Sequence, residues 1–135
     1  MAAEGMVDAL RRVHEMVKPQ GVVVDLHPTA DRAVLLVGDV VAGVVESDAG
    51  ARRHQSATDA IAVAVDNGWF AVEEPSTFDF LTWGDTVDEL CDYVLAHWRD
   101  TAIAPATMAR ARALLAPGMT PHVRERVAAC RLVPR

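Results

Sequence analysis

Long apolar runs and cysteines are scarce in this sequence, and each scarcity excludes a class of protein. No apolar stretch approaches the ~20 residues that a transmembrane helix needs, so we expect no membrane partner. The N-terminal segment Met1–Arg12 also lacks the apolar core of a secretion signal. The two cysteines, Cys91 and Cys130, lie in apolar segments, where buried reduced thiols are expected rather than a disulfide. These features predict a cytoplasmic location.

The sequence also has few Lys and Arg residues, and its histidines and cysteines do not have the spacing of metal ligands. The 13 Lys and Arg residues are outnumbered by 19 Asp and Glu residues, which leaves a formal net charge of −6. Because nucleic-acid binding needs a concentrated basic face, we expect no nucleic-acid partner. No pair of histidines has the spacing of a zinc site and no His–Cys cluster occurs, so no metal is expected.

What is present is a chain of 135 residues, 51% of them hydrophobic, which is enough for a single α/β domain over residues 1–135. Its apolar residues follow the helical period in some segments and the strand pattern in others. Helices are predicted over Met6–Val17, from Ala51 to a stop at Asn67-Gly68, from Asp85 or Thr86 to Trp98, and over Pro105–Leu115. Strands are predicted over Val22–Leu26, Ala33–Val37, Val40–Glu46, Trp69–Thr82 and His122–Val133, with Gly38-Asp39 as a hairpin turn.

Two of these segments carry expectations about burial. Val22–Leu26 is apolar almost without alternation, which predicts a central strand buried on both faces. Phe78 and Phe80 would share one face of their strand, and we expect both to pack in the core.

The stretch Asp8–Pro28 consists of an amphipathic helix, the run Lys18-Pro19-Gln20-Gly21, a valine-rich strand and Asp-Leu-His-Pro. It resembles the late helix and fifth strand of class I S-adenosylmethionine-dependent methyltransferases, although Gln20 stands where that family has glycine. The segments Phe78–Thr82, Thr86–Leu90 and Val123–Val127 also look like that family. The resemblance covers nearly the whole chain but only the C-terminal half of the family's domain. It implies a partial Rossmann-like sheet equivalent to strands 5-7-6, plus an extra hairpin, flanked by helices.

The part of that fold that binds the cofactor is missing. Such enzymes hold S-adenosylmethionine on a glycine-rich turn, but the eight glycines here include no G-x-G pair. We therefore expect no cofactor for the isolated chain, and S-adenosylmethionine only with a partner chain.

Candidate ligand-binding residues are His27, Trp83 and His54. His27 would follow a sheet strand at its carboxyl end, where open α/β sheets place their ligands. Trp83 ends a strand beside Gly84 and offers a flat apolar wall with one donor. His54 leads into a helix that could face the same cleft, as a weaker third member. No residue is assigned a catalytic role.

The leading hypothesis is a truncated methyltransferase-like protein that is not self-sufficient for methyl transfer and acts as a binding or assembly module. One alternative is a subunit of a split methyltransferase, completed by a cofactor-binding chain. Another is a small stand-alone cyclase or isomerase with a pocket around His27. Because truncation would uncover the outer edge of Val22–Leu26, we expect a homodimer, or a heteromer with a cofactor-binding chain. The hairpin Ala33–Glu46 could instead cover that edge within one chain.

Overall fold

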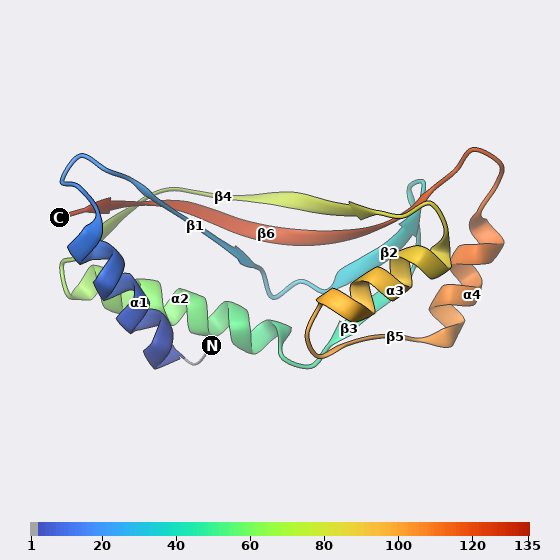
Figure 1. Ribbon diagram of the computed structural model, residues 1–135, viewed down its shortest axis with the longest axis horizontal. Coiled ribbons are helices and arrows are strands. Elements are labelled where there is room, and N and C mark those ends of the chain that lie inside the picture. The colour runs from blue at the N-terminus through green and yellow to red at the C-terminus, as the bar shows by residue number, and fades with distance from the viewer. Residues whose placement is uncertain (1–2) are drawn as a thin grey trace. The chain divides into compact units, whose positions relative to one another are not determined.

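The computed structural model describes residues 3–135, which form an α/β fold with a mostly antiparallel open sheet of six strands. The first two residues of the segment weighed as a secretion signal lie outside this range. The elements follow in the order α1 (Ala3–Met16), β1 (Val23–Pro28), β2 (Ala33–Val37), β3 (Val40–Ser47), α2 (Gly50–Asp66), β4 (Phe70–Trp83), α3 (Val87–His97), β5 (Thr101–Ile103), α4 (Pro105–Leu114) and β6 (Pro121–Pro134) (Figure 1). None of the helices among these residues is long and apolar enough to cross a membrane.

Strand pairing is organised around β6. The sheet has the order β1-β6-β2-β3-β5, and β4 also pairs with β6. The order 5-7-6 implied by the resemblance predicts three neighbouring strands in one sheet. They are the segments Val22–Leu26, His122–Val133 and Trp69–Thr82, in that order. The pairing of β6 with both β1 and β4 confirms this expectation.

The contacts divide the chain into two compact units, which are described separately. Of the described residues, unit 1 comprises 3–30, 51–78 and 127–135, and unit 2 comprises 31–50 and 79–126. Unit 1 therefore holds α1, β1, α2, the first part of β4 and the last part of β6. Unit 2 holds β2, β3, α3, β5, α4 and the remaining parts of β4 and β6.

In unit 1, β1 runs antiparallel to the end of β6, with Val23 opposite Leu132 and Pro28 opposite Val127. A core of Ala64, Phe70 and Leu132 is fully buried, and apolar side chains of α1, α2 and β1 pack against it. The helices lie on one side of these strands (Figure 1). His14 of α1 holds the chain end, because its Nε2 lies 3.1 Å from the carbonyl oxygen of Arg135.

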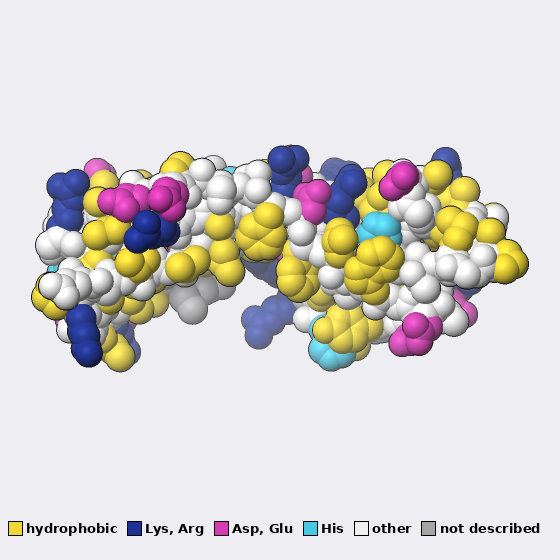
Figure 2. Space-filling model, turned by 90° about the horizontal axis from the view of Figure 1, so that it is seen from above, with side chains coloured by type: hydrophobic (Ala, Val, Ile, Leu, Met, Phe, Trp, Pro, Cys, Tyr) yellow, Lys and Arg dark blue, Asp and Glu magenta, His cyan; other side chains and the backbone are white. Residues whose placement is uncertain are grey.

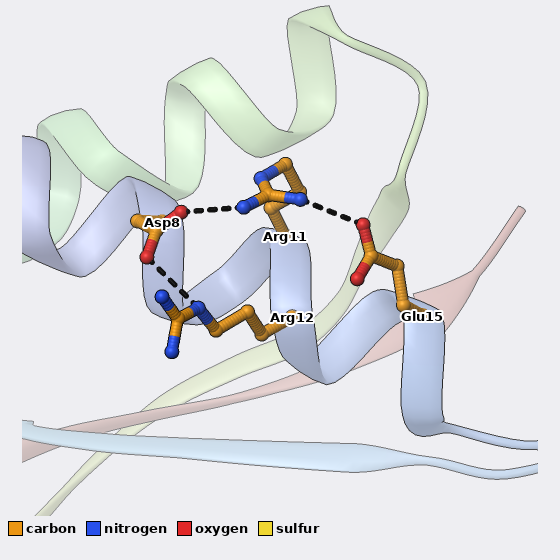
Figure 3. Close-up of polar contacts among 4 residues, drawn as sticks. All are labelled: Asp8, Arg11, Arg12 and Glu15. Carbon is orange, nitrogen blue, oxygen red and sulfur yellow. Dashed lines mark hydrogen bonds and ion pairs between the residues drawn. The ribbon is translucent and has the colours of Figure 1, made fainter.

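The outer side of α1 is charged and solvated. Arg11 forms ion pairs with Asp8 at 2.7 Å and with Glu15 at 2.8 Å, and Arg12 reaches Asp8 at 3.0 Å (Figure 3). The hydrogen bond from Arg11 lowers the pKa of Asp8 from its usual value. These pairs are one helical turn apart on an exposed face, where each stabilises the helix only slightly.

In unit 2, β2 and β3 form the predicted hairpin through Gly38, whose φ is 58°. β2 also pairs with the start of β6, and β3 pairs with β5. α3 and α4 pack on this sheet over a core that contains Leu35, Leu90, Val94 and Val123. Thr86 caps α3 as expected, because its Oγ1 accepts a hydrogen bond from the backbone N–H of Glu89 at 3.1 Å.

The expectation that β1 is a central strand buried on both faces is wrong. β1 ends the sheet order, and its exposure alternates, with Val24 at 62% and Leu26 at 58%. The reason is that the helices of unit 1 cover only the face that carries Val23, Asp25 and His27. Among the described residues, neither strand of the hairpin pairs with β1, because β2 pairs with β3 and β6, and β3 pairs with β2 and β5.

The expected core positions of two phenylalanines are also wrong. Phe78 is 42% exposed and Phe80 is 53% exposed, because both faces of β4 are uncovered from Val72 to Leu81, where every position is exposed. The short strand β5 had not been predicted. It has only three residues, too few for an apolar period to be recognised.

Candidate functional site

Unit 1 contains a pocket of about 490 Å³, within the size range of small-molecule sites. It is bordered by β1, α2, β4 and β6. Its walls are mainly apolar and are supplied by residues such as Ile61, Val72, Pro75, Ala128 and Ala129. Its polar groups are few and come from His27, His54, Thr58, Ser76, Thr77 and Cys130. A mostly apolar cavity with a few polar groups is the usual composition of a ligand site.

His27 faces this pocket because of the strand alternation of β1. Successive side chains of a strand point to opposite faces, so Val23, Asp25 and His27 share one face. The register with β6 places Asp25 opposite Cys130 and His27 opposite Ala128, and both of these β6 residues line the pocket.

The ring of His27 is held by its neighbour on the same face. Nδ1 of His27 lies 2.6 Å from Oδ2 of Asp25, and their side chains are 15% and 22% exposed. An ionised Asp25 accepts the hydrogen bond that Nδ1–H donates, which sets the orientation of the imidazole. Nε2 is then the nitrogen that remains for a ligand.

His54 brings a second imidazole to the same pocket from the start of α2. The ring centroids of His27 and His54 are 5.4 Å apart, with an angle of 35° between the planes. Nδ1 of His54 is buried and has no hydrogen-bond partner in the described part of the chain. An unsatisfied buried polar atom costs about 1–3 kcal/mol, and its presence beside a cavity is typical of a ligand site.

Cys130 does not supply a nucleophile to this pocket. Burial raises the pKa of its thiol, and the neighbouring charge of Asp25 raises it further. The thiolate is the reactive form of cysteine, so Cys130 is a poor nucleophile at neutral pH. The pocket therefore presents imidazole and hydroxyl groups to a ligand, together with a thiol whose raised pKa favours the unreactive protonated form.

The three candidate residues from the sequence are placed in two units. His27 and His54 meet in the pocket of unit 1. Trp83 belongs to unit 2, where its ring contacts that of His122, with centroids 4.3 Å apart and planes tilted by 32°. A site that joins Trp83 to His27 therefore stays a prediction.

Sequence reasoning missed Asp25 as the partner of His27, and it missed the contributions of Thr58 and of Ser76-Thr77. The alternation of β1 could have identified Asp25, since residues two apart on a strand share a face. No comparable signal marks the residues of β4, because their place depends on the pairing with β6.

At two of the glycines, the space that a side chain would occupy is filled by other residues of this chain. A Cβ on Gly43 would lie 2.3 Å from Oγ1 of Thr107, and a Cβ on Gly84 would lie 2.6 Å from Cβ of Leu90. These glycines let this chain's own helices pack closely, so the space that a side chain would fill is already occupied. Gly43 and Gly84 therefore leave no space for a ligand.

Within residues 3–135, no group of three or more His, Cys, Asp or Glu side chains could hold a metal ion. No protein-family model matches the chain, and no curated protein and no solved structure matches it significantly.

Proposed function

We propose that this protein is a binding module whose unit 1 holds a small, mostly apolar molecule with one polar group. The observation that carries the proposal is the pocket in which His27, oriented by Asp25, lies beside His54. The apolar walls would take the body of the ligand, and the two imidazoles would hydrogen-bond its polar group. A cytoplasmic location belongs to the proposal and is supported by the two free thiols.

Phenylacetate, phenylacetamide and 2-phenylethanol are suitable probes, because they share one apolar ring and differ in the polar group. Binding is followed by the ring NMR signals of the histidines. The signals of His27 and His54 should shift together and saturate with at least one probe. The signal of His97, which is exposed on α3, serves as the internal reference.

Substitution separates this site from nonspecific binding. His54→Gln should weaken binding, whereas His97→Gln should leave it unchanged. Probe binding that survives both His27→Gln and His54→Gln would refute the proposed site.

A second candidate is the methyltransferase-like half, favoured by the neighbouring order of β1, β6 and β4. In one version of this candidate, the chain cannot transfer a methyl group by itself and acts as an assembly module. In the other version, the chain is one subunit of a split methyltransferase, and a partner chain would supply the glycine-rich turn that binds S-adenosylmethionine. Calorimetry of the isolated chain with millimolar S-adenosylmethionine should show no binding, and saturable binding at one site per chain would contradict both forms.

A third candidate is a small cyclase or isomerase, favoured by the Asp25–His27 pair. An imidazole that is oriented by a carboxylate can accept and return a proton during an isomerisation. This candidate requires a ligand with an acidic C–H or O–H group next to Nε2 of His27. Solvent-deuterium exchange into a bound probe, lost in His27→Gln, is the observation that would favour it over simple binding.

We also propose that two copies associate through β1. The strand ends the sheet order and presents the exposed side chains of Val24 and Leu26. Val22–Leu26 has no lysine or proline that would oppose pairing with another strand, and Asp25 is its one charged residue; the described strand β1 ends in Pro28. In an antiparallel pair centred on Leu26, Asp25 of one copy would face His27 of the other, which would favour this register.

A further inference from the structure

Unit 2 has a polar hollow of about 280 Å³ that is distinct in composition from the pocket of unit 1. It is lined by Asp31, Arg32, Val34, Asp79, Arg124 and Arg126, all of which belong to unit 2. Three arginines against two aspartates leave one excess positive charge on a chain whose net charge is −6.

Arg124 is the group in this hollow that is available to a ligand. Arg32 already lies 3.6 Å from Glu46, and Arg126 also has an interaction within the chain. Arg124 is exposed, and no carboxylate among the described residues pairs with it. A guanidinium presents a planar fork of donors that matches a carboxylate or a phosphate.

An aromatic surface lies on the same face of β6. His122, Arg124 and Arg126 alternate along this strand and therefore point to one side. The rings of Trp83 and His122 are in contact, with centroids 4.3 Å apart and planes tilted by 32°, and Trp83 remains 57% exposed while His122 is only 8% exposed. His122 thus forms a floor beneath Trp83, and the rest of the indole surface is open to a ligand.

The spacing of the two features suits one small molecule. Residues two apart on a strand are separated by about 7 Å, which sets the distance from the His122 position to the Arg124 position. In the view from above, Figure 2 shows a histidine side chain beside hydrophobic ones, with Lys or Arg and acidic side chains on the same surface.

We propose that unit 2 carries a second binding site, for a small anion with a flat ring, in which Trp83 stacks on the ring and Arg124 binds the anionic group. The anion is a phosphate or a carboxylate, because the guanidinium fork binds both. Arg32 and Arg126 add positive charge around the anion, and Asp31 and Asp79 line the same hollow. Neither His27 nor His54 takes part, so this site is independent of the function proposed for unit 1.

The indole N–H signals of Trp69, Trp83 and Trp98 in a ¹H–¹⁵N spectrum provide the test, once Trp→Phe variants have assigned them. Adenosine monophosphate and 4-phenylbutyrate are the probes for a phosphate and a carboxylate, and adenosine and inorganic phosphate are the half-ligands. The Trp83 signal should shift with saturation for at least one of the two complete probes. The half-ligands should bind about 10-fold more weakly or worse, because each lacks one of the two contacts.

Arg124→Gln should weaken binding of the complete probe about 10-fold or more, since a charged hydrogen-bond donor is lost. The matched control is Arg110→Gln, which removes an exposed arginine of α4 outside the hollow and should have no effect. If Arg124→Gln does not fold, Trp83→Leu measured by calorimetry replaces it and should also weaken binding. The proposal is overturned if neither complete probe shifts the Trp83 signal at millimolar concentration, or if the shift is the same in Arg124→Gln as in the unmodified protein.

Discussion

Oδ2 of Asp25 lies 2.6 Å from Nδ1 of His27, its neighbour two positions along β1, and of the two residues only His27 lines the pocket of unit 1. This contact makes Asp25 a positioning residue for His27. It acts on a ligand through the orientation of the imidazole and not by direct contact.

Asp25→Ala should therefore weaken probe binding about 10-fold, because a charge-assisted hydrogen bond contributes about 1.5–3 kcal/mol. Asp25→Asn should restore most of the affinity, since the amide oxygen still accepts from Nδ1–H. Titration of the probes against the histidine ring signals measures both variants. If Asp25→Ala and the unmodified protein bind the probes with equal affinity, probe binding does not depend on the orientation of the His27 imidazole by Asp25.

The exposed strand face of β1 leads to a prediction about assembly. Leu26→Lys should shift the protein from dimer to monomer in sedimentation at micromolar concentration, because it places charge on the proposed pairing strand. Leu95→Lys is the matched control, since Leu95 is 45% exposed on α3 and Leu26 is 58% exposed on β1. A monomer of 14.6 kDa without any substitution would contradict the dimer.

Two phenylalanines of β4, Phe70 and Phe80, should contribute differently to the free energy of unfolding. Phe70 is 1% exposed in the core of unit 1, so Phe70→Ala should cost about 3–5 kcal/mol of the free energy of unfolding. Phe80→Ala should cost less than about 1 kcal/mol, because that side chain is 53% exposed. Denaturant unfolding measures both, and a large loss in Phe80→Ala would indicate that its exposed face is covered in solution.

His122 should make stability depend on pH. Burial lowers its pKa, Arg124 lowers it further, and Asp39 acts in the opposite direction. The unfolded chain then binds more protons than the folded one once the pH falls below the ordinary value of 6.5. Stability from this group is complete above that pH and is lost as the pH falls toward the lowered pKa.

The melting temperature measured between pH 5 and 8 checks this expectation. His122→Phe keeps a ring beneath Trp83 and should reduce the decline toward acidic pH. His97→Gln, which removes an exposed histidine, should leave the decline unchanged. Identical pH profiles for His122→Phe and the unmodified protein would refute the role of His122.

Local chemistry made much of the fold predictable. The apolar period identified α1 and α2, Thr86 identified the start of α3, and Gly38 identified the hairpin turn. Each of these signals acts between residues a few positions apart, so the chain carries it without reference to the rest of the fold.

The sequence by itself determined these elements, the placement of His27 at the end of a strand and the pairing of β6 with β1 and β4 that the resemblance implied. Only the tertiary structure decided that one face of β1 is exposed to solvent, that Phe78 and Phe80 are exposed and that His54 lies beside His27. The physical reason is that burial and side-chain proximity depend on which helix covers which strand face. That choice depends on the packing of segments far apart in the chain, and a local pattern of apolar residues contains no information about it.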